Sequence, residues 1–228
     1  MVPPDNRKSI LSLELPAMGA QARRAECAVE RAKSGNTTDL VYILDWIAAL
    51  ALAVITLPIV VLSLLWVMAV DIGNPFYTQI RIGLNGKPYR IYKVRSMRHD
   101  HRGHARFCAN GDDRILLGGH FLRKSRIDEL PQLFNVLIGE MALVGPRPEQ
   151  PAFVKTFLKE IPRYQDRLNV KPGITGLAQI SQGYVDSIHG TQIKLKYDIF
   201  YIKKRSLRIW FYTMKGTIRV IIFRQGAR

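Results

Sequence analysis

One uninterrupted apolar segment limits how this chain can fold more than any other feature. From Trp46 to Val70 the sequence contains no charged residue. At about 1.5 Å per residue, a helix of this length can cross a hydrocarbon core of about 30 Å. The chain is therefore expected to be attached to a membrane by a helix over residues 39–71, and a plain transmembrane helix is the default interpretation.

Two features of this segment favour a helix that enters and leaves the membrane on the same side. Pro58 deprives the carbonyl of Val54 of its helical partner and predicts a kink, and Thr56 can help to satisfy the freed carbonyls. Both flanks are also basic, and because positive residues favour the cytoplasmic side, neither end is marked as the outer one. From the residues alone, a re-entrant helix hinged at Pro58 and a spanning helix both stay open.

The charge of the chain narrows its partners. Lys and Arg number 34 against 18 Asp and Glu, a formal net charge of +16. Such an excess suits nucleic acid, anionic lipid or a phosphorylated substrate. No helix-turn-helix, zinc-finger or RNA-binding aromatic signature accompanies it, so nucleic acid is not an expected partner. The two cysteines, Cys27 and Cys108, have no metal or redox spacing and indicate a reducing compartment.

The segments on either side of the apolar run differ in what they can bury. Residues 1–38 are polar and rich in small residues, which is typical of a flexible, loose or partly helical tail. Residues 72–228 are expected to form a separate globular domain. Within it, β-prone stretches at 76–82 and 89–94 flank Asn85-Gly86, a strong hairpin signal. The predicted fold class is α+β, mainly helical with a small β-hairpin.

Two adjacent carboxylates, Asp128 and Glu129, carry the strongest sign of chemistry. They stand at the predicted start of a short amphipathic helix, and Arg123 and Arg126 come just before them. A helix N-terminus and nearby arginines favour ionised carboxylates, which can act on a phosphate as nucleophile or metal ligand. A helix-capping pair with surface arginines is the alternative interpretation.

A second candidate site surrounds Arg147. Pro146 and Pro148 fix the backbone on either side of it, and a guanidinium held in this way can grip a phosphate through two parallel hydrogen bonds. A rigid turn with a surface arginine is the alternative. Further along, Lys171–Gly176 (KPGITG) is predicted to be a turn with flexible glycines, which shapes the pocket of the candidate site and takes no part in the chemistry.

Three other stretches are weaker candidates. Histidines within residues 99–104, around Asp100, could bind a metal, although a solvated loop is the simpler interpretation. Asp112 and Asp113 invite comparison with the acidic metal motif of nucleotide-sugar glycosyltransferases, but they read equally well as a turn, which we favour. The C-terminal residues from 197 onward mix aromatic and basic side chains, a composition that suits helices at a membrane surface.

Together these segments resemble the bacterial sugar transferases, the polyprenyl-phosphate hexose-1-phosphate transferases also called monotopic phosphoglycosyl transferases. The similarity covers about residues 40–222 in the order of the family. It is carried by PFYTQIRIGLNGKPYRIYKVRSM (75–97), DDRILLGGHFLRKS (112–125), RKSRIDELPQLFNVLIGEMALVGPRPE (123–149), KPGITGLAQI (171–180) and KYDIFYIKKRSL (196–207).

The resemblance implies the transfer of a sugar-1-phosphate from a nucleotide diphosphate sugar, with a UDP-hexose the expected donor, to polyprenyl (undecaprenyl) phosphate with Mg²⁺. Asp128 maps to the family's nucleophile, which attacks the β-phosphate and carries a phosphosugar intermediate. Glu129 is expected to hold Mg²⁺ with Asp128, and the Pro-Arg-Pro of residues 146–148 to bind the nucleotide end of the donor. The other expected phosphate contacts are Lys93, Arg95, Ser96, Arg123 and Arg126.

The chain departs from the family pattern at three positions. The family's re-entrant helix usually has a small residue before its proline, where this chain has Leu57. Arg126 replaces a usual small polar residue beside the carboxylates, and Trp210 stands where an acidic residue is usual. Whatever that carboxylate holds must be held differently here.

The expected protein is therefore a monotopic transferase on the cytoplasmic face of the bacterial inner membrane that primes exopolysaccharide or related glycan synthesis. Residues 72–228 are expected to be its cytosolic catalytic domain, with C-terminal helices at the membrane surface. Two other functions stay open. One is a metal-dependent glycosyltransferase that uses Asp112 and Asp113 without a covalent intermediate, and the other is a non-enzymatic adaptor that binds anionic membrane lipid. The sequence also leaves open which sugar is transferred and whether the chain forms a homo-oligomer.

Overall fold

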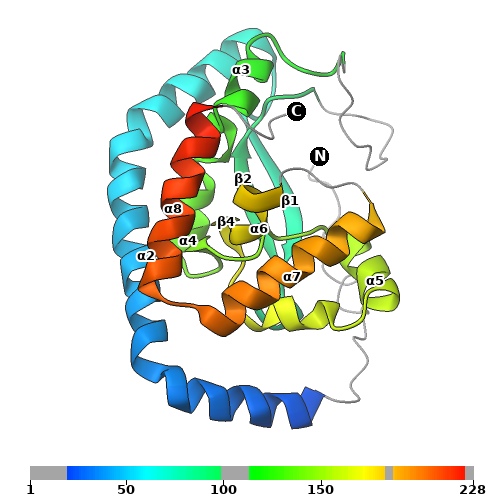
Figure 1. Ribbon diagram of the computed structural model, residues 1–228. Coiled ribbons are helices and arrows are strands. Elements are labelled where there is room, and N and C mark those ends of the chain that lie inside the picture. Colours follow the sequence, from blue (N-terminus) through cyan, green and yellow to red (C-terminus); the bar gives the residue numbers. More distant parts are fainter. Residues whose placement is uncertain (1–19, 99–112, 183–186, 224–228) are drawn as a thin grey trace. The chain divides into compact units, whose positions relative to one another are not determined.

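A computed structural model describes residues 20–98, 113–182 and 187–223, with the backbone alone for residues 20–39. The described part is mainly helical and contains one small antiparallel hairpin, as the sequence predicts (Figure 1). It also contains a second pair of short strands, which are parallel. The contacts described below all lie within the compact unit that begins at Val41.

The apolar segment lies in one long helix, α2 (Ala20–Val70). The part of this helix from Leu40 to Val70 is long and apolar enough to cross a membrane, and most of its large apolar side chains are exposed. The helix begins well before the predicted start at residue 39, so residues 20–38 of the predicted tail are helical. Residues 1–19 of that tail lie outside the described residues.

The helix is continuous through Pro58. Two side-chain hydroxyls near it donate to backbone carbonyls. Thr56 Oγ1 donates to the carbonyl of Leu52 at 2.7 Å, and Ser63 Oγ donates to that of Ile59 at 2.7 Å. Such bonds help a proline-containing helix to keep its carbonyls satisfied in an apolar medium. Re-entry of the helix at Pro58 stays a prediction.

Both ends of the apolar part of α2 pack against the domain that follows it (Figure 1). Near one end, Trp46 Nε1 donates to the carbonyl of Leu137 at 3.1 Å. Near the other, Trp66 Nε1 donates to the carbonyl of Leu117 at 3.0 Å. Buried apolar side chains of α2 accompany these bonds, namely Val41 and Ala49 in the main core and Val67 in a smaller cluster with Val94, Leu116 and Leu122. One domain therefore holds the apolar helix at two separated points.

The predicted hairpin is confirmed. Strands β1 (Phe76–Ile82) and β2 (Pro88–Val94) pair antiparallel along their whole length. The short 3-10 turn η1 (Leu84–Gly86) joins them, and both Asn85 (φ 56°) and Gly86 (φ 75°) have left-handed backbones. Asn and Gly are the residues that tolerate this conformation best, which is why the dipeptide predicts the turn.

Short helices make up most of the remaining described chain. They are α3 (Gly119–Lys124), η2 (Ile127–Glu129), α4 (Gln132–Leu137), α5 (Pro151–Glu160), η3 (Tyr164–Asn169), α6 (Leu177–Gln182), α7 (Ile188–Lys204) and α8 (Leu207–Ile222). The side chains of Ser187 and Ser206 accept hydrogen bonds from backbone N–H groups in the first turns of α7 and α8. These serine caps fix where the two C-terminal helices begin.

The segment Lys171–Gly176 was expected to be a turn, and this expectation is wrong for part of it. Residues Gly173–Thr175 form strand β4, which pairs in parallel with β3 (Ala142–Val144). Glycine is required at position 173 by close packing, because a Cβ atom there would lie 2.1 Å from the backbone nitrogen of Gly145. The two backbones can approach each other only because neither residue carries a side chain.

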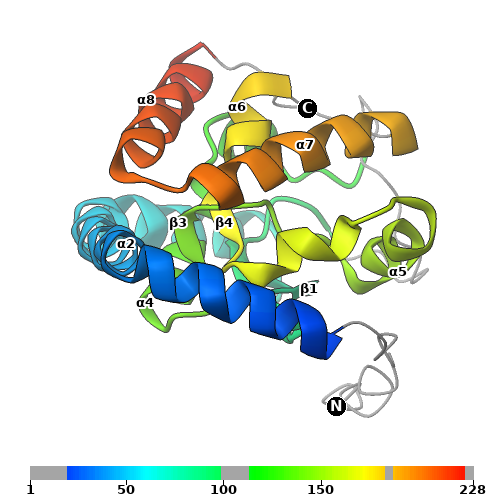
Figure 2. The same ribbon diagram turned by 60° about the horizontal axis from the view of Figure 1, so that its bottom comes forward.

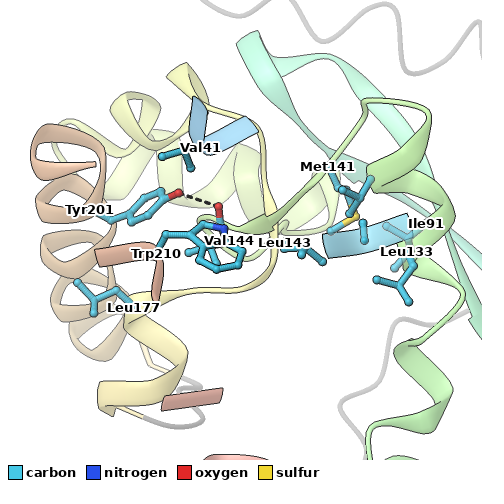
Figure 3. Packing of buried hydrophobic residues seen from close by; sticks show 11 residues of the cluster. Val41, Ile91, Leu133, Met141, Leu143, Val144, Leu177, Tyr201 and Trp210 are labelled. Carbon is cyan, nitrogen blue, oxygen red and sulfur yellow. Dashed lines mark hydrogen bonds between the residues drawn. The ribbon is translucent and has the colours of Figure 1, made fainter. Parts of the chain in front are cut away.

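Strand β3 lies in the middle of the main hydrophobic core, where Leu143 and Val144 pack with side chains of α2, α4, α7 and α8 (Figure 3). The hydroxyl of Tyr201 on α7 donates to the carbonyl of Val144 at 2.7 Å. In the view of Figure 2, β3 and β4 lie between α4 and α7. The segment that leaves β3 toward Arg147 therefore starts from a fixed point.

A buried hydrogen bond fixes α8 to α2. The indole Nε1 of Trp210 donates to the carboxylate of Asp45, and both side chains are buried. The second carboxylate oxygen, Asp45 Oδ2, has no hydrogen-bond partner among the described residues. Where the family pattern has an acidic residue on the last helix, this chain has an indole there, and a carboxylate on α2 accepts its hydrogen bond.

Candidate active site

The two carboxylates lie in the 3-10 turn η2, just before α4, and both are buried. The turn begins at Arg126, which has a left-handed backbone (φ 59°). A small polar residue such as Asn adopts this conformation more readily than Arg, which accounts for the small polar residue usual at this position. Nothing in the structure explains why this chain has Arg126 instead. The turn also places Asp128 and Glu129 ahead of the helix that the sequence predicts they would begin.

Asn135 holds α4 against the hairpin and so brings β2 to the carboxylates. Its side chain is fully buried. The amide nitrogen donates to the carbonyl of Arg90 at 2.7 Å, and the amide oxygen accepts from the backbone N–H of Tyr92 at 3.3 Å. The next residue along β2, Lys93, therefore lies within reach of η2.

Glu129 is surrounded by cations. Its carboxylate accepts from Lys93 Nζ at 2.7 Å and from Arg147 Nη2 at 2.6 Å, with Arg147 Nη1 at 3.4 Å and Arg126 Nη1 at 3.9 Å. Burial acts to raise the pKa of the Glu129 carboxyl, but the charges of Arg147 and Lys93 outweigh it and hold that pKa well below its usual range. Glu129 in turn raises the pKa of the Arg147 guanidinium. This carboxylate is therefore ionised throughout the physiological pH range.

Asp128 has a different environment. Its Oδ1 atom is buried and has no hydrogen-bond partner among the described residues. Burial raises the pKa of the Asp128 carboxyl to about 6, although the charge of Lys93 opposes the shift. Two neighbouring carboxylates are thus pushed apart in pKa by their surroundings, a pattern that is common where they take different roles. Glu129 binds the cations, while Asp128 keeps an oxygen available.

The backbone that carries Arg147 is fixed at every residue from Pro146 to Glu149. Each carbonyl in this segment accepts a hydrogen bond from elsewhere in the chain. In order, the donors are Gly173 N at 2.9 Å, Arg167 Nη2 at 2.7 Å, Arg81 Nη1 at 3.1 Å and Ile82 N at 3.0 Å. The Glu149 side chain is also held, by ion pairs with Lys194 and Arg81. We refer to Pro146–Glu149 as the arginine platform.

Arg167 and its partners support the platform from below the surface. The side chains of Arg167 and Asp198 are buried and joined by a hydrogen bond of 2.9 Å between Nε and Oδ2. Arg167 Nη1 also donates to the hydroxyl of Tyr164 at 2.9 Å. Neither Arg167 nor Asp198 is among the residues predicted from the sequence. The available signal was Asp198 itself, an acidic residue within the otherwise basic stretch KYDIFYIKK.

The remaining predicted residues are divided between two places. Lys93, Arg126 and Arg147 come together around the carboxylates, and Pro146 and Pro148 belong to the arginine platform. Arg95 instead lies buried at the end of α2, where it donates to the carbonyl of Asp71 at 2.8 Å and pairs with its carboxylate at 3.2 Å.

Ser96 is buried nearby, and its carbonyl accepts from Leu116 N at 3.1 Å. Arg123 contributes positive charge to Asp128, while its Nη1 contacts Met97 Sδ at 2.9 Å. Contact of these side chains with phosphate stays a prediction.

The weaker metal candidates add little to this site. Within residues 20–98, 113–182 and 187–223, no group of three or more His, Cys, Asp and Glu side chains is arranged to hold a metal ion. The predicted histidine cluster and Asp112 lie outside the described residues. Asp113 is exposed in a turn, the interpretation that the sequence favoured.

The sequence profile described as bacterial sugar transferase matches residues 38–224, so the chain belongs to this family of enzymes. The family expected from the motifs is thereby confirmed.

Three relatives illustrate the family. The UDP-N-acetylgalactosamine-undecaprenyl-phosphate N-acetylgalactosaminephosphotransferase of Aeromonas hydrophila is 41% identical over 186 residues, which are 81% of this chain and 44% of that protein. A UDP-glucose:undecaprenyl-phosphate glucose-1-phosphate transferase of Caulobacter vibrioides is 39% identical over 169 residues, 72% of this chain and 63% of that protein. One of the same name from Klebsiella pneumoniae is 37% identical over 182 residues, 76% of this chain and 39% of that protein. The chain thus spans less than two thirds of the length of each.

Proposed function

We propose that this protein transfers a sugar-1-phosphate from a nucleotide diphosphate sugar, a UDP-hexose, to undecaprenyl phosphate, the first membrane step of exopolysaccharide or related glycan synthesis. The names of its relatives support the reaction class. The single observation that carries the proposal is the buried Asp128 carboxylate with an unpartnered oxygen, next to a Glu129 that gathers Lys93 and Arg147. Such a site combines a nucleophile with positive charge for a diphosphate.

The proposed reaction has two displacements. In the first, an Asp128 carboxylate oxygen forms a bond to the sugar-linked β-phosphorus of the donor. The bond from that phosphorus to the bridging oxygen breaks, and its electron pair leaves on the nucleoside monophosphate. In the second, an oxygen of undecaprenyl phosphate attacks the same phosphorus, and the bond to Asp128 breaks to restore the carboxylate. No proton has to move in either step, so the site needs a nucleophile and charge stabilisation more than an acid.

Positive charge close to Asp128 addresses the main barrier to this chemistry. Donor and acceptor are both anions, and bringing them together in one site is repulsive. Lys93, Arg126 and Arg147 lie within 4 Å of the Glu129 carboxylate and so within the same small region. A covalent intermediate lets each anion react in turn with this cluster. The low pKa of Glu129 keeps it ionised, and its charge holds Lys93 and Arg147 in position.

The family resemblance implies Mg²⁺, and the donor set fits it. Mg²⁺ prefers oxygen ligands and usually takes one or two carboxylates, with substrate phosphates and water completing its shell. Asp128 Oδ1 is a buried acceptor without a partner in the described part of the chain, the kind of atom that such an ion satisfies. We propose that Asp128 and Glu129 are its protein ligands. When bound, the ion would offset the charge of the donor diphosphate.

We further propose that α2 is inserted from the cytoplasmic face of the bacterial inner membrane and returns to that face. At about 1.5 Å per residue, the helix rises about 30 Å between Trp46 and Trp66, the thickness of a hydrocarbon core. A spanning helix would place the two indoles near opposite faces of the membrane. Support for one-sided attachment comes from the hydrogen bonds that both indoles make with one domain.

The experiment that tests the proposed function looks for the covalent intermediate. The chain is incubated with Mg²⁺ and UDP-N-acetylgalactosamine or UDP-glucose, without acceptor, and examined by intact-protein mass spectrometry. The parent protein should gain the mass of a sugar phosphate and release UMP. Asp128→Asn should form no adduct and should not transfer. Glu129→Gln should form adduct much more slowly, because the charge that holds Lys93 and Arg147 is gone.

Asp113→Asn is the matched control, because it removes an exposed carboxylate outside the proposed site. It should form adduct at the parent rate. Transfer by Asp128→Asn at near the parent rate would show that Asp128 is not the nucleophile. Loss of transfer in Asp113→Asn, with no adduct in the parent, would instead favour a glycosyltransferase that works without a covalent intermediate.

A further inference from the structure

A small cavity beside the carboxylates is lined by several hydrogen-bond donors, and two of these donors have no acceptor among the described residues. Its volume is about 10 Å³, roughly the space that one water-sized oxygen occupies. The residues that line it are Arg81, Ile91, Lys93, Gln132, Arg147 and Pro148. Three of them are cations and one is a neutral amide, so the cavity suits a single anionic oxygen.

Gln132 is the neutral member of this group. It is the first residue of α4, one helical turn after Asp128, and its side chain is only 3% exposed. Its amide nitrogen Nε2 is buried and has no hydrogen-bond partner among the described residues. Arg81, on the wall of the same cavity, has a buried Nε that is also without a partner. A buried donor without an acceptor destabilises the fold, and each such group calls for an explanation.

Two other side chains that line the cavity have donors that are already engaged. Lys93 and Arg147 bind the Glu129 carboxylate. Gln132 has no such partner, although the unpartnered Asp128 Oδ1 lies on the adjacent turn. A donor at the start of α4 and an acceptor in the turn before it are therefore both left without a partner among the described residues. This is the arrangement expected where a third group, bound only during the reaction, satisfies them.

We propose that Gln132 is a catalytic residue whose amide N–H donates to one non-bridging oxygen of the phosphoryl group that Asp128 attacks. This proposal rests on the proposed function. As the Asp128 oxygen bonds to phosphorus and the bridging oxygen leaves with its electron pair, negative charge redistributes over the non-bridging oxygens. A preorganised donor at one of them stabilises that charge without reorganisation. The neutral amide adds no charge beside Asp128, so it leaves the nucleophile's ionisation to the surrounding cations.

The test compares Gln132→Met with the parent in single-turnover adduct formation, using the full-length protein in detergent with Mg²⁺ and UDP-N-acetylgalactosamine or UDP-glucose. Methionine has a similar length but no donor. The rate constant of adduct formation should fall about 100- to 1,000-fold, the effect of removing one oxyanion-type donor. The donor concentration at half-maximal rate should change less than about threefold, because the interaction strengthens in the transition state.

Thermal unfolding of the same variant separates this role from a structural one. Since the amide nitrogen has no partner among the residues that the structure describes, replacing it with an apolar group should leave the melting temperature unchanged or raise it. Gln182→Met is the matched control, because Gln182 Nε2 does donate, to the carbonyl of Gly190 at 3.0 Å. That variant should lose stability yet form adduct at the parent rate. Gln132→Glu, which keeps the shape of the side chain but presents an acceptor, should lose the step at least as fully as Gln132→Met.

An adduct rate within threefold of the parent in either Gln132 variant would overturn the proposal. The proposal would also be overturned if the variant had a lowered melting temperature and its adduct rate fell only in proportion to the loss of folded protein. That result would mean that Gln132 contributes to packing and not to the reaction. Failure of the proposed function itself is distinguishable, because the parent chain would then form no adduct and release no UMP from any donor tested.

Discussion

The hydrogen bond between Trp210 and Asp45 should contribute measurably to stability, because it joins α8 to α2 in a buried position. Asp45 is 1% exposed and Trp210 is 7% exposed. Trp210→Phe keeps a ring against Phe211, whose centroid lies 4.9 Å from that of the indole. It removes the indole N–H that donates to the Asp45 carboxylate, whose Oδ2 already lacks a partner among the described residues. A hydrogen bond to a charged group contributes about 1.5–3 kcal/mol, and we expect a loss of this size.

The assay is unfolding of the full-length protein in detergent. For a chain of this size, 1 kcal/mol shifts the melting temperature by about 2–4 °C, so the expected decrease is roughly 3–12 °C. Trp66→Phe is the matched control, because its indole is 47% exposed and donates to a neutral carbonyl. It should lose only about 0.5–1.5 kcal/mol. If Trp210→Phe is no less stable than Trp66→Phe, the buried bond does not have the importance that we assign to it.

A double-mutant cycle isolates the pair. Asp45→Leu alone leaves a buried indole N–H without an acceptor, whereas the double variant removes both partners. The double variant should therefore be more stable than the sum of the single losses implies, with a coupling energy of about 1–2 kcal/mol. Strict additivity would mean that the two side chains act independently.

Three further outcomes are expected. Arg147→Lys keeps the charge but loses the two-pronged contact with Glu129. The donor KM should therefore rise at least about tenfold, which is the equivalent of one charged hydrogen bond. Near-normal donor kinetics would mean that Arg147 is only a turn residue. With the native cysteines replaced, single cysteines at Ala20 and at Asn85 should both resist an impermeant reagent in intact cells, whereas external labelling near residue 20 would mean a spanning helix. The charges of Lys194, Arg167 and Arg81 overcome burial and lower the folded-state pKa of Glu149 below 4.5, so its contribution to stability is present above pH 4.5 and is lost as pH falls through the lowered value. Glu149→Gln should accordingly be less stable than the parent at pH 7, and the gap should close with acidification; a gap unchanged at pH 3 would contradict the assignment.

Local features of this fold can be predicted from the sequence, because the residues that determine them are neighbours. Asn85-Gly86 gives the hairpin, since both residues accept a left-handed backbone. The apolar spacing after Pro131 gives α4. That helix begins later than predicted, because Arg126 has a left-handed backbone and the two carboxylates that follow it form a separate 3-10 turn. Nothing in the type of residue at position 126 signals this.

Pairs that are distant in sequence could not be predicted from it. Asp198 lies 31 positions from Arg167, and Trp210 lies 165 positions from Asp45. Burying each of these polar groups would cost free energy without a hydrogen-bond partner, and the partner lies on another helix. Which residue becomes the partner depends on tertiary packing. The unused amide of Gln132 escaped notice for a related reason. The cavity that Gln132 lines is formed with residues of β1, β2 and the arginine platform, which are distant from it in sequence.

The arginine platform has a consequence for how activity data on this family member should be interpreted. The four carbonyls of Pro146–Glu149 are held from β1, η3 and β4, and α7 supports that arrangement through Asp198. Because the conformational entropy of this segment is given up during folding, donor binding does not have to order it. Small displacements introduced at any of those supports would all reach the same guanidinium. A mutational scan scored by donor use alone would then mark positions on β1, η3, β4 and α7 as if they touched the nucleotide, although their contacts are with the backbone of the platform that we propose binds it or with the side chain of Arg167.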